Sequence, residues 1–315
     1  MAGFAAPAPS VGVARRRLFR RSPGRRRRTG WPLVAAFVLP ALAVYLLFMV
    51  WPLVGNLELS LHAWDGFAPQ RTFVGLDNYI ALVNDADFWS AFSNNLIWAI
   101  IGTVAPIAIG LPLAIILWSG SRFRLAFRAI YFVPVIVPIV VIGLVWGWIY
   151  NPLFGVLNTV LEAVGLEDLA RGWLGDPDTA LYAVLFTAIW STFGFCVVMF
   201  LAGLQGIDMS LVDAAKVDGA NAWQRTRHVL LPGIAPVFTF VLTITLVGAF
   251  AVFDIVYVMT RGGPGTATET MAGYAYKMAF TRSFAGYGAS ISTVIALISL
   301  VLAVLLLRYR ERGRS

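Results

Sequence analysis

The sequence predicts an all-helical integral membrane protein with six membrane-spanning helices and both chain ends on the cytoplasmic side. Three observations predict this class. Of the 315 residues, 59% are hydrophobic and 13% are charged, which is more apolar than a typical soluble domain. The apolar residues fall into six long runs. The basic residues concentrate in alternate connections between those runs, as they do in membrane proteins whose basic loops stay in the cytoplasm.

Each apolar run is long enough to cross a bilayer as a helix, which takes about 20 residues. The runs are 31–54, 96–118, 129–149, 180–201, 235–258 and 289–307. None contains Lys, Arg or Glu, and Asp254 is the one Asp among them. Their lengths of 19 to 24 residues exceed those of ordinary strands. Prolines within the runs, including Pro134 and Pro138, predict kinks in the helices.

The distribution of basic residues sets the predicted orientation. With the N-terminus inside, 19 of the 24 Lys and Arg residues lie on the cytoplasmic side and five lie outside. Nine of the 19 lie in the tail 15–28. The net charge of +8 is therefore explained by topology and contact with anionic membrane lipid, and no nucleic-acid partner is expected.

The chain divides into a tail and one membrane domain. Residues 1–30 are mostly Ala, Pro, Gly and Arg without a periodic apolar pattern, which predicts a disordered basic cytoplasmic tail. Residues 31–315 are predicted to form the transmembrane domain. On the outer side, 151–155 predicts a turn and 156–164 a short amphipathic helix. Cys196, the sole cysteine, lies in the fourth run and is interpreted as a small buried residue, so no disulfide or cysteine metal cluster is expected.

The connection between the fourth and fifth runs, 204–234, has strong local signals on the predicted cytoplasmic side. Ser210 is predicted to cap a short helix, with Asp213 three residues later as the acidic member of a capping box. Ala214 and Ala215 then give this helix a surface with little side-chain bulk. Such a surface suits docking into a cleft of another protein.

The second half of this connection predicts a second helix. Asp218-Gly219 is a turn signal that ends the first helix. The second helix is expected from about Ala220, with basic residues near its end and Pro232 stopping it before the fifth run. The two helices together predict a rigid elbow between two spans.

This elbow resembles the cytoplasmic signature of ABC importer permeases, which reads Glu-Ala-Ala, three residues, Gly, nine residues, Ile, any residue, Leu-Pro. Asp213 stands for the Glu and Val229 for the Ile. The identical positions are Ala214, Ala215, Gly219, Leu231 and Pro232. The resemblance implies a type I ABC importer permease fold, in which these seven residues form the coupling helix that sits in a groove of the ATPase subunit.

Two further stretches resemble the carbohydrate branch of that family, the maltose-transporter type. They are Phe-Val-Gly-Leu-Asp-Asn-Tyr at 73–79, and Phe-Asp-Ile-Val-Tyr at 253–257 followed by Gly-Gly-Pro at 262–264. The resemblance covers the chain from about Trp31 to its end. It implies import of a di- or oligosaccharide across the bacterial inner membrane, with a second permease in a heterodimer, an ATPase dimer and an extracytoplasmic solute-binding protein. The branch also includes transporters of glycerol phosphate esters and polyols, so the substrate stays open.

The chain itself is not expected to be an enzyme. No phosphate-binding Gly-x-x-x-x-Gly-Lys-Ser/Thr loop occurs, and the two lysines, Lys216 and Lys277, lie in other settings. ATP and Mg²⁺ are therefore expected on a partner ATPase, with no cofactor or metal on this chain.

Polar and aromatic groups within the spans are candidates for the substrate path, because rings stack on the apolar faces of sugars. The candidates are Trp190, Phe193, Phe253, Asp254 and Tyr257. An ionisable group at membrane depth usually faces a cavity or a partner, which favours Asp254 unless it lies near the outer interface. Aromatic residues in spans also serve as packing or interface residues, so the four rings are ambiguous.

Three other classes fit less well. A secondary transporter driven by an ion gradient is the nearest alternative, but it would show inverted repeats and several ionisable groups within the spans. Asp254 is the one acidic residue there, and no clear repeat is visible. A membrane enzyme needs a cluster of reactive groups at membrane depth, and the two histidines, His62 and His228, are predicted on opposite sides. A membrane scaffold gives no reason for the elbow.

Overall fold

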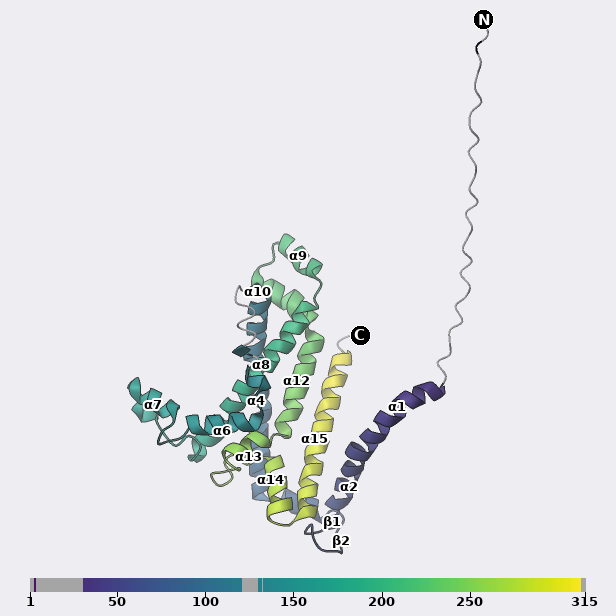
Figure 1. Cartoon of the computed structure of the whole chain (residues 1–315), viewed down its shortest axis with the longest axis vertical. Helices are drawn as coiled ribbons and strands as arrows, with labels where there is room; N and C mark the ends of the chain where they lie inside the picture. Colours follow the sequence, from purple (N-terminus) through teal and green to yellow (C-terminus); the bar gives the residue numbers. More distant parts are fainter. Residues whose placement is uncertain (1–2, 4–30, 121–129, 132, 313–315) are drawn as a thin grey trace. The chain divides into compact units, whose positions relative to one another are not determined.

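The computed structural model describes residue 3 and residues 31–120, 130–131 and 133–312. Apart from Gly3, the predicted basic tail 1–30 lies outside the described residues. The chain forms two compact units, Met1–Pro52 and Leu53–Ser315 (Figure 1). Each unit has its own architecture.

The first unit contains an apolar helical rod made of α1 (Trp31–Tyr45) and the π-helical turn η1 (Leu46–Val50). Large apolar side chains along it are exposed, with Phe37 at 77% and Phe48 at 68%. The helix continues as α2 (Trp51–Ser60). The stretch Ala35–Ser60 is apolar and long enough to cross a membrane. The first predicted apolar helix is therefore confirmed, and it extends beyond its apolar run.

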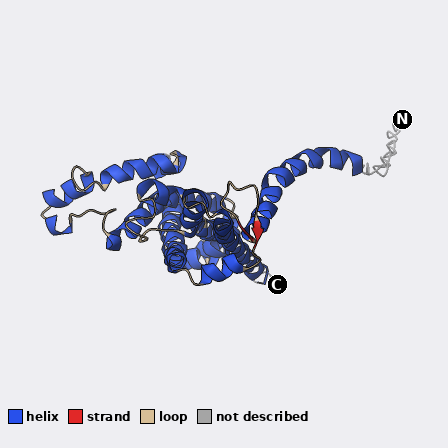
Figure 2. Ribbon diagram, turned by 90° about the horizontal axis from the view of Figure 1, so that it is seen from below, coloured by secondary structure: helices blue, strands red, loops and turns tan. Residues whose placement is uncertain are grey.

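Four long helices form the second unit: α4 (Ala86–Trp118), α8 (Pro177–Gln205), α12 (Ala235–Phe250) and α15 (Ala285–Arg312). α4 packs against α8 and α12, and α12 packs against α15 (Figure 1). Figure 2 shows that helices make up most of the described chain. At the crossing of α4 and α8, a Cβ on Gly110 would lie 2.6 Å from the Cβ of Cys196. Small residues thus let these helices approach closely, as in other membrane bundles, and the buried packing role predicted for Cys196 is confirmed.

The second, fourth and sixth predicted spans lie within α4, α8 and α15. α4 and α8 begin before their apolar runs because acidic residues cap them. Asp85 accepts hydrogen bonds from the backbone N–H groups of Asp87 and Phe88, and Asp176 accepts one from the N–H of Asp178. Asp85 also accepts hydrogen bonds from the hydroxyls of Tyr274 (2.6 Å) and Tyr287 (2.5 Å). Partial burial would raise the pKa of Asp85, but these hydrogen bonds hold it below its ordinary value.

The third and fifth predicted spans are not single helices, so six continuous spans are not what the structure has. The run 129–149 breaks at Val137 and Pro138, and α6 (Ile139–Ile149) has only 11 residues. Pro138 adopts an extended ψ of 135°, and it has no N–H to continue the ladder. The run 235–258 breaks after α12, and the short α13 (Asp254–Met259) follows. In the described residues, four helices are long and apolar enough to span, or five if the bent pair at the start of α12 counts as one span.

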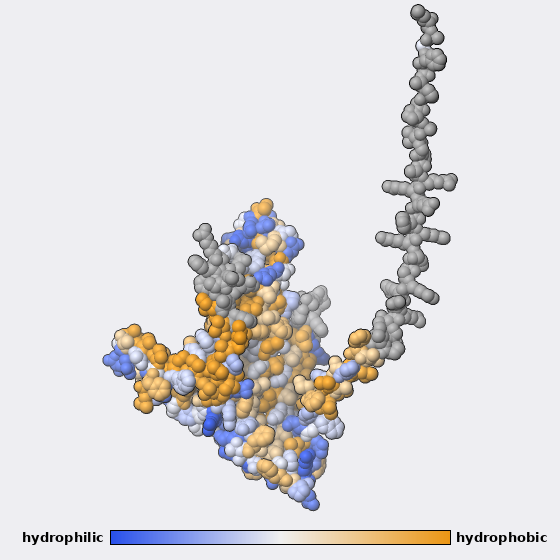
Figure 3. Space-filling view, viewed as in Figure 1, coloured by the Kyte–Doolittle hydropathy of each residue, from blue (hydrophilic) through white to orange (hydrophobic). Residues whose placement is uncertain are grey.

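Among the shorter elements, β1, β2 and α14 lie at one end of the second unit, opposite the end that carries α9 and α10, and α7 lies to the side of the bundle (Figure 1). The shorter elements are β1 (His62–Ala63), paired antiparallel with β2 (Thr72–Phe73), α3 (Asp77–Val83), α7 (Val156–Ala163), η2 (Glu167–Leu169), α14 (Met271–Tyr276) and η4 (Lys277–Thr281). The predicted amphipathic helix after the 151–155 turn is thus confirmed as α7. Both ends carry hydrophilic surface, whereas the helices between them are largely hydrophobic (Figure 3).

Residues 73–79 link the end of α2 to α3 through side-chain hydrogen bonds. The Asn78 side chain donates to the carbonyls of Ser60 (2.8 Å) and His62 (3.1 Å), and the Tyr79 hydroxyl lies 2.7 Å from the Ser60 hydroxyl. Gly75 provides the turn, with a φ of 58°. One of the two stretches that resemble the carbohydrate branch therefore has a structural role at this end of the bundle.

Candidate functional site

The elbow between α8 and α12 comprises residues 208–234. Its first arm is α9 (Met209–Val217), which begins one residue before Ser210. Asp208 is the cap, because its carboxylate accepts from the Ser210 N–H at 2.9 Å. That hydrogen bond also lowers the pKa of Asp208. The prediction of Ser210 as the cap is therefore wrong, and Asp213 is no capping-box residue: it pairs with Lys216 at 2.8 Å on the exposed surface.

Gly219 makes the turn of the elbow. Its φ of +79° lies in the left-handed region that a residue with a side chain rarely adopts. The Ala220 N–H donates to the Ala215 carbonyl at 2.9 Å, which closes the end of α9. The predicted turn is confirmed.

The second arm starts at α10 (Ala222–Arg225), two residues later than predicted. Asn221 and Gln224 form a reciprocal capping box, with hydrogen bonds of 2.9 and 2.8 Å. The arm continues as the π-helical turn η3 (Thr226–Leu230) and α11 (Leu231–Gly233). Pro232 lies inside α11 and does not stop the helix. The helix ends after Gly233, and a bend of 70° separates it from α12.

One side of the elbow is anchored in the bundle. Val212, Leu230 and Ile234 are buried in a hydrophobic cluster with residues of α4 and α8. Of the predicted coupling residues, Val229 and Leu231 pack against the same cluster, and Ala215 is half-buried. These residues hold the elbow in place.

Other residues of the elbow are exposed. They include four of the predicted coupling residues, namely Asp213, Ala214, Gly219 and Pro232. Four large apolar side chains of the elbow are also exposed: Met209, Leu211, Val217 at 88% and Trp223 at 68%. Sequence reasoning missed these four, although isolated apolar residues in a predicted cytoplasmic loop were the signal that could have found them. Exposed apolar side chains on a rigid frame favour protein docking.

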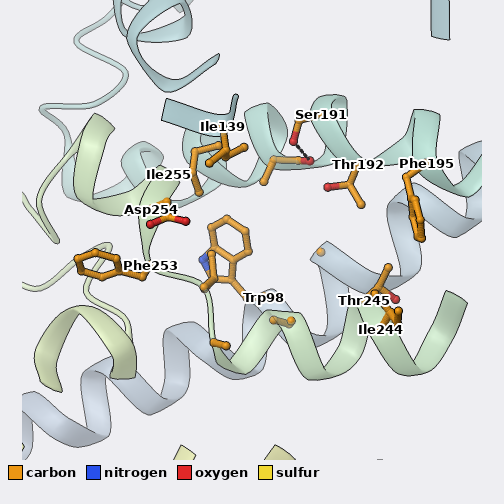
Figure 4. A pocket seen from close by; sticks show the side chains of 16 residues that line it. Trp98, Ile139, Ser191, Thr192, Phe195, Ile244, Thr245, Phe253, Asp254 and Ile255 are labelled. Carbon is orange, nitrogen blue, oxygen red and sulfur yellow. Dashed lines mark hydrogen bonds between the residues drawn. The ribbon is translucent and has the colours of Figure 1, made fainter. Parts of the chain in front are cut away.

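A cavity of about 300 Å³ lies among α4, α8, α12 and the break in the fifth span. It is lined by Trp98 of α4, Ser191 and Thr192 of α8, Thr245 of α12 and Asp254 of α13 (Figure 4). Its volume is at the small end of the range for ligand cavities. Apolar walls with a few convergent polar groups are typical of such sites.

Long-range hydrogen bonds hold the break in the fifth span. The buried Asn95 side chain of α4 donates to the Ala249 carbonyl at 2.7 Å and accepts from the Met271 N–H at 2.7 Å. The Thr270 hydroxyl donates to the Val252 carbonyl at 3.0 Å. Non-helical backbone at membrane depth persists only when such groups pair inside the protein. The break places Phe253 and Asp254 at the cavity.

The structure brings two of the predicted path residues, Phe253 and Asp254, to the cavity. Tyr257 lies one turn along α13 and stacks on Phe253, with ring centroids 5.1 Å apart. Tyr257 lines a neighbouring cavity of about 240 Å³, together with Phe253. Phe253 therefore lines both cavities.

Trp190 and Phe193 are on α8, but neither lines the cavity. Trp190 packs edge-on against Trp146, with centroids 5.5 Å apart. Phe193 packs edge-on against Tyr131 at 5.7 Å. Ser191 and Thr192, which lie between them in the sequence, line the cavity instead. The two adjacent hydroxyl residues, Ser191 and Thr192, within an apolar run could have indicated from the sequence that this face of α8 lines a cavity. Nothing comparable in the sequence indicated Trp98.

The neighbouring cavity contains an ion pair with a buried carboxylate and a partly exposed lysine. The Glu269 side chain is 3% exposed, and one of its carboxylate oxygens lies 3.4 Å from Lys277 Nζ. A Cβ on Gly262 or Gly273 would lie 2.6 or 2.5 Å from the carboxylate, so a side chain at either position would require the Glu269 carboxylate to move. Burial raises the pKa of Glu269, and Lys277 opposes that shift.

The structure defines a helical membrane protein with an elbow between two of its long helices, and similarity to known proteins defines its family. Residues 102–312 match the family of binding-protein-dependent transport system inner membrane components. A Bacillus subtilis protein named as a probable ABC transporter permease, YurN, is 38% identical over 281 residues, covering 89% of this chain and 96% of that protein. This chain belongs to the family of binding-protein-dependent transport system inner membrane components, and it is a multi-pass inner-membrane protein.

Other relatives carry more specific names. The trehalose/maltose transport system permease protein MalF of Thermococcus litoralis is 32% identical over 271 residues, covering 86% of this chain and 91% of that protein. Among solved structures, a bacterial ABC transporter for import of the acidic polysaccharide alginate has a chain with a TM-score of 0.76 and 24% identity. That match covers 89% of this chain and 95% of the other, and it supports the type I importer permease fold.

Proposed function

We propose that this chain is a permease subunit of a binding-protein-dependent ABC importer that carries a sugar, of di- or oligosaccharide size, into the cell. The observation that carries the proposal is the elbow: a turn at one end of the bundle, anchored by Val212 and Leu230, that exposes several large apolar side chains. The sugar is supported by the relatives named for trehalose/maltose, lactose and arabinooligosaccharides. The cavity, with polar groups between apolar walls, suits such a ligand.

The elbow is proposed to be the coupling contact with a separate ATPase subunit. Asp213, Ala214, Gly219 and Pro232 would meet the ATPase directly, whereas Ala215, Val229 and Leu231 would keep the elbow fixed to the bundle. ATP and Mg²⁺ would bind to an ATPase dimer. Closure of that dimer would move the elbow, and the bundle would rock to expose the cavity to alternate sides.

The proposed topology has six spans with both termini in the cytoplasm and the elbow facing the ATPase. The placement of the elbow and the outer segments at opposite ends of the second unit supports it (Figure 1). The third span would consist of two segments joined at Pro138, and the fifth of α12 with α13. Residues 1–30 would form a basic tail, and 31–315 the permease domain with the elbow region 204–234.

The remaining proposed partners complete the importer. A second permease subunit would pair with this chain as a heterodimer. An extracytoplasmic solute-binding protein would deliver the sugar at the end that carries α3 and α14. The residues at the cavity, Phe253 and Asp254, are proposed to touch the sugar, and Trp190, Phe193 and Tyr257 stay candidates for other points along the path.

The test is sugar uptake by proteoliposomes that contain the whole complex: this chain, the second permease, the ATPase and the binding protein. The probes are radiolabelled maltose, trehalose and lactose. Uptake of at least one sugar is expected with ATP enclosed on the ATPase side, and none without ATP. Uptake of none of the three sugars would contradict the sugar assignment. Uptake driven by an ion gradient without the ATPase would overturn the coupling mechanism.

A further inference from the structure

Trp98 is a buried side chain of α4 whose indole ring lines the cavity. The residue is 4% exposed, yet it lines the cavity opposite Asp254 and beside Ser191 and Thr192 (Figure 4). Its Nε1 is one of two buried side-chain polar atoms that have no hydrogen-bond partner among the described residues. An unpaired buried N–H group is costly, because it has lost water without gaining another acceptor.

The indole ring is held by its neighbours. A Cβ on Gly102, one turn further along α4, would lie 3.5 Å from Trp98 Cε3 and 3.7 Å from Leu185 Cδ2. The ring therefore lies against the bare backbone at Gly102, next to α8. In Figure 4 the indole nitrogen is on the side of the ring toward Asp254 and Phe253. The N–H is thus a donor with a fixed position.

The other polar groups of the cavity wall offer acceptors. The Ser191 hydroxyl donates to the Ala188 carbonyl at 2.8 Å, and the Thr245 hydroxyl donates to the Val241 carbonyl at 2.9 Å. Since their protons are used within their own helices, their oxygens are left to accept. The Asp254 carboxylate, which is exposed in this chain, also accepts when ionised. The wall therefore combines several acceptors with one fixed donor.

We infer that Trp98 is a substrate-binding residue whose indole N–H donates to a hydroxyl oxygen of a neutral polyhydroxylated ligand in this cavity. The inference rests on the proposed function and names the chemistry of its site. A sugar hydroxyl accepts one hydrogen bond and donates another, so it can bridge Trp98 and an acceptor such as Asp254. An ammonium ligand offers donors only and would leave Trp98 unpaired. An anionic ligand would meet the Asp254 carboxylate.

The test is Trp98→Phe in the complete reconstituted complex, with Trp89→Phe as the matched control. Phe keeps an aromatic ring in the cavity wall but removes the donor. Trp89 lies on the same helix, and its indole donates to the Val83 carbonyl at 2.8 Å, away from the cavity. The probe is the sugar that the wild-type complex transports among maltose, trehalose and lactose. The KM of uptake should rise about tenfold for Trp98→Phe, the effect of one typical hydrogen bond, and stay unchanged for Trp89→Phe.

Monodeoxy analogues of the same sugar separate binding from packing. For wild type, one analogue should show a KM about tenfold higher than the parent sugar, because it lacks the hydroxyl that Trp98 contacts. For Trp98→Phe, that analogue and the parent sugar should have the same KM. A merely structural role would lower activity with all analogues equally. Equal discrimination by wild type and Trp98→Phe would therefore overturn the inference.

Asp254→Asn provides a second variant if Trp98→Phe fails to assemble. Asp254 is exposed, so the change should leave folding intact. An Asn side chain is a weaker hydrogen-bond acceptor than an ionised Asp. The KM should therefore rise for the parent sugar, and it should rise less for the deoxy analogue that lacks the hydroxyl between Trp98 and residue 254. An unchanged analogue pattern would contradict the bridging arrangement. If the wild-type complex transports sugar and neither variant alters recognition, this inference fails while the proposed function stands. If the complex transports no sugar, both fail together.

Discussion

The elbow and the cavity differ in how their residues come together. The elbow is built from one continuous stretch of chain, and its form comes from Asp208, Gly219 and Asn221, each of which acts on its own local backbone. The cavity is lined by residues from Trp98 to Ile255. Its form depends on hydrogen bonds such as that from Asn95 to Ala249, 154 residues apart in the sequence.

This difference predicts that the two regions respond to mutation in different ways. A change to an exposed residue of the elbow removes no buried contact, so it should affect coupling while the bundle stays folded. A change to the hydrogen bonds behind the cavity should affect the bundle itself, because buried backbone groups would lose their partners.

The largest effect is expected for Gly219→Leu. Nothing lies within 4 Å of a Cβ at this position, so the new side chain would project from the proposed docking surface. ATP-dependent uptake by the reconstituted complex should fall by at least tenfold, because a bulky group would separate the elbow from the ATPase. Membrane insertion, measured as the amount of chain purified from the membrane, should be unchanged.

Gly165→Leu is the matched control. Gly165 has a φ of +76°, close to the +79° of Gly219, and nothing lies within 4 Å of its Cβ position either. It follows α7, away from the elbow. Both variants carry the same backbone strain, so normal uptake by Gly165→Leu would assign the loss in Gly219→Leu to docking. Equal loss in both would point to strain and count against the coupling role.

A smaller effect, on stability, is expected for Asn95→Ala. The change leaves the Ala249 carbonyl and the Met271 N–H without their partner, and each buried unpaired group costs about 1–3 kcal/mol. The unfolding midpoint in detergent should fall by several degrees. Asn84→Ala is the control, because the Asn84 side chain donates to the Ile80 carbonyl on the exposed surface. Equal midpoints for the two variants would show that the break in the fifth span does not depend on Asn95.

The smallest effect is expected for Asn221→Ala, which removes the capping box of α10. Loss of such a cap costs about 1 kcal/mol. Because the effect is local, amide hydrogen exchange should accelerate about fivefold in 222–226, consistent with that cost. Exchange in α4 and α8 should be unchanged. Acceleration throughout the bundle would show that the elbow and the bundle open together and would remove the distinction between the two regions.

Local signals in the sequence were sufficient for most of the elbow. The turn at Gly219 was predicted because the Asp-Gly pair ends a helix through its own backbone preferences. The error at the start of α9 is of the same local kind: Asp208 and Ser210 are both good caps, and they lie two residues apart. The exact first residue depends on how the chain leaves α8, which local preference does not decide.

The apolar runs by themselves determined that this chain is an integral membrane protein, because a helix that crosses the hydrocarbon core needs about 20 apolar residues. Only the tertiary structure decided where those helices break and which side chains face the cavity. An apolar side chain can contact either lipid or another helix, so the residues on both sides of a break are equally apolar. Hydropathy therefore does not reveal where a span breaks. The break after Phe250 is stable because Asn95 and Thr270 satisfy the backbone there. The position of Trp98 likewise follows from the packing of α4 against α8 and α12.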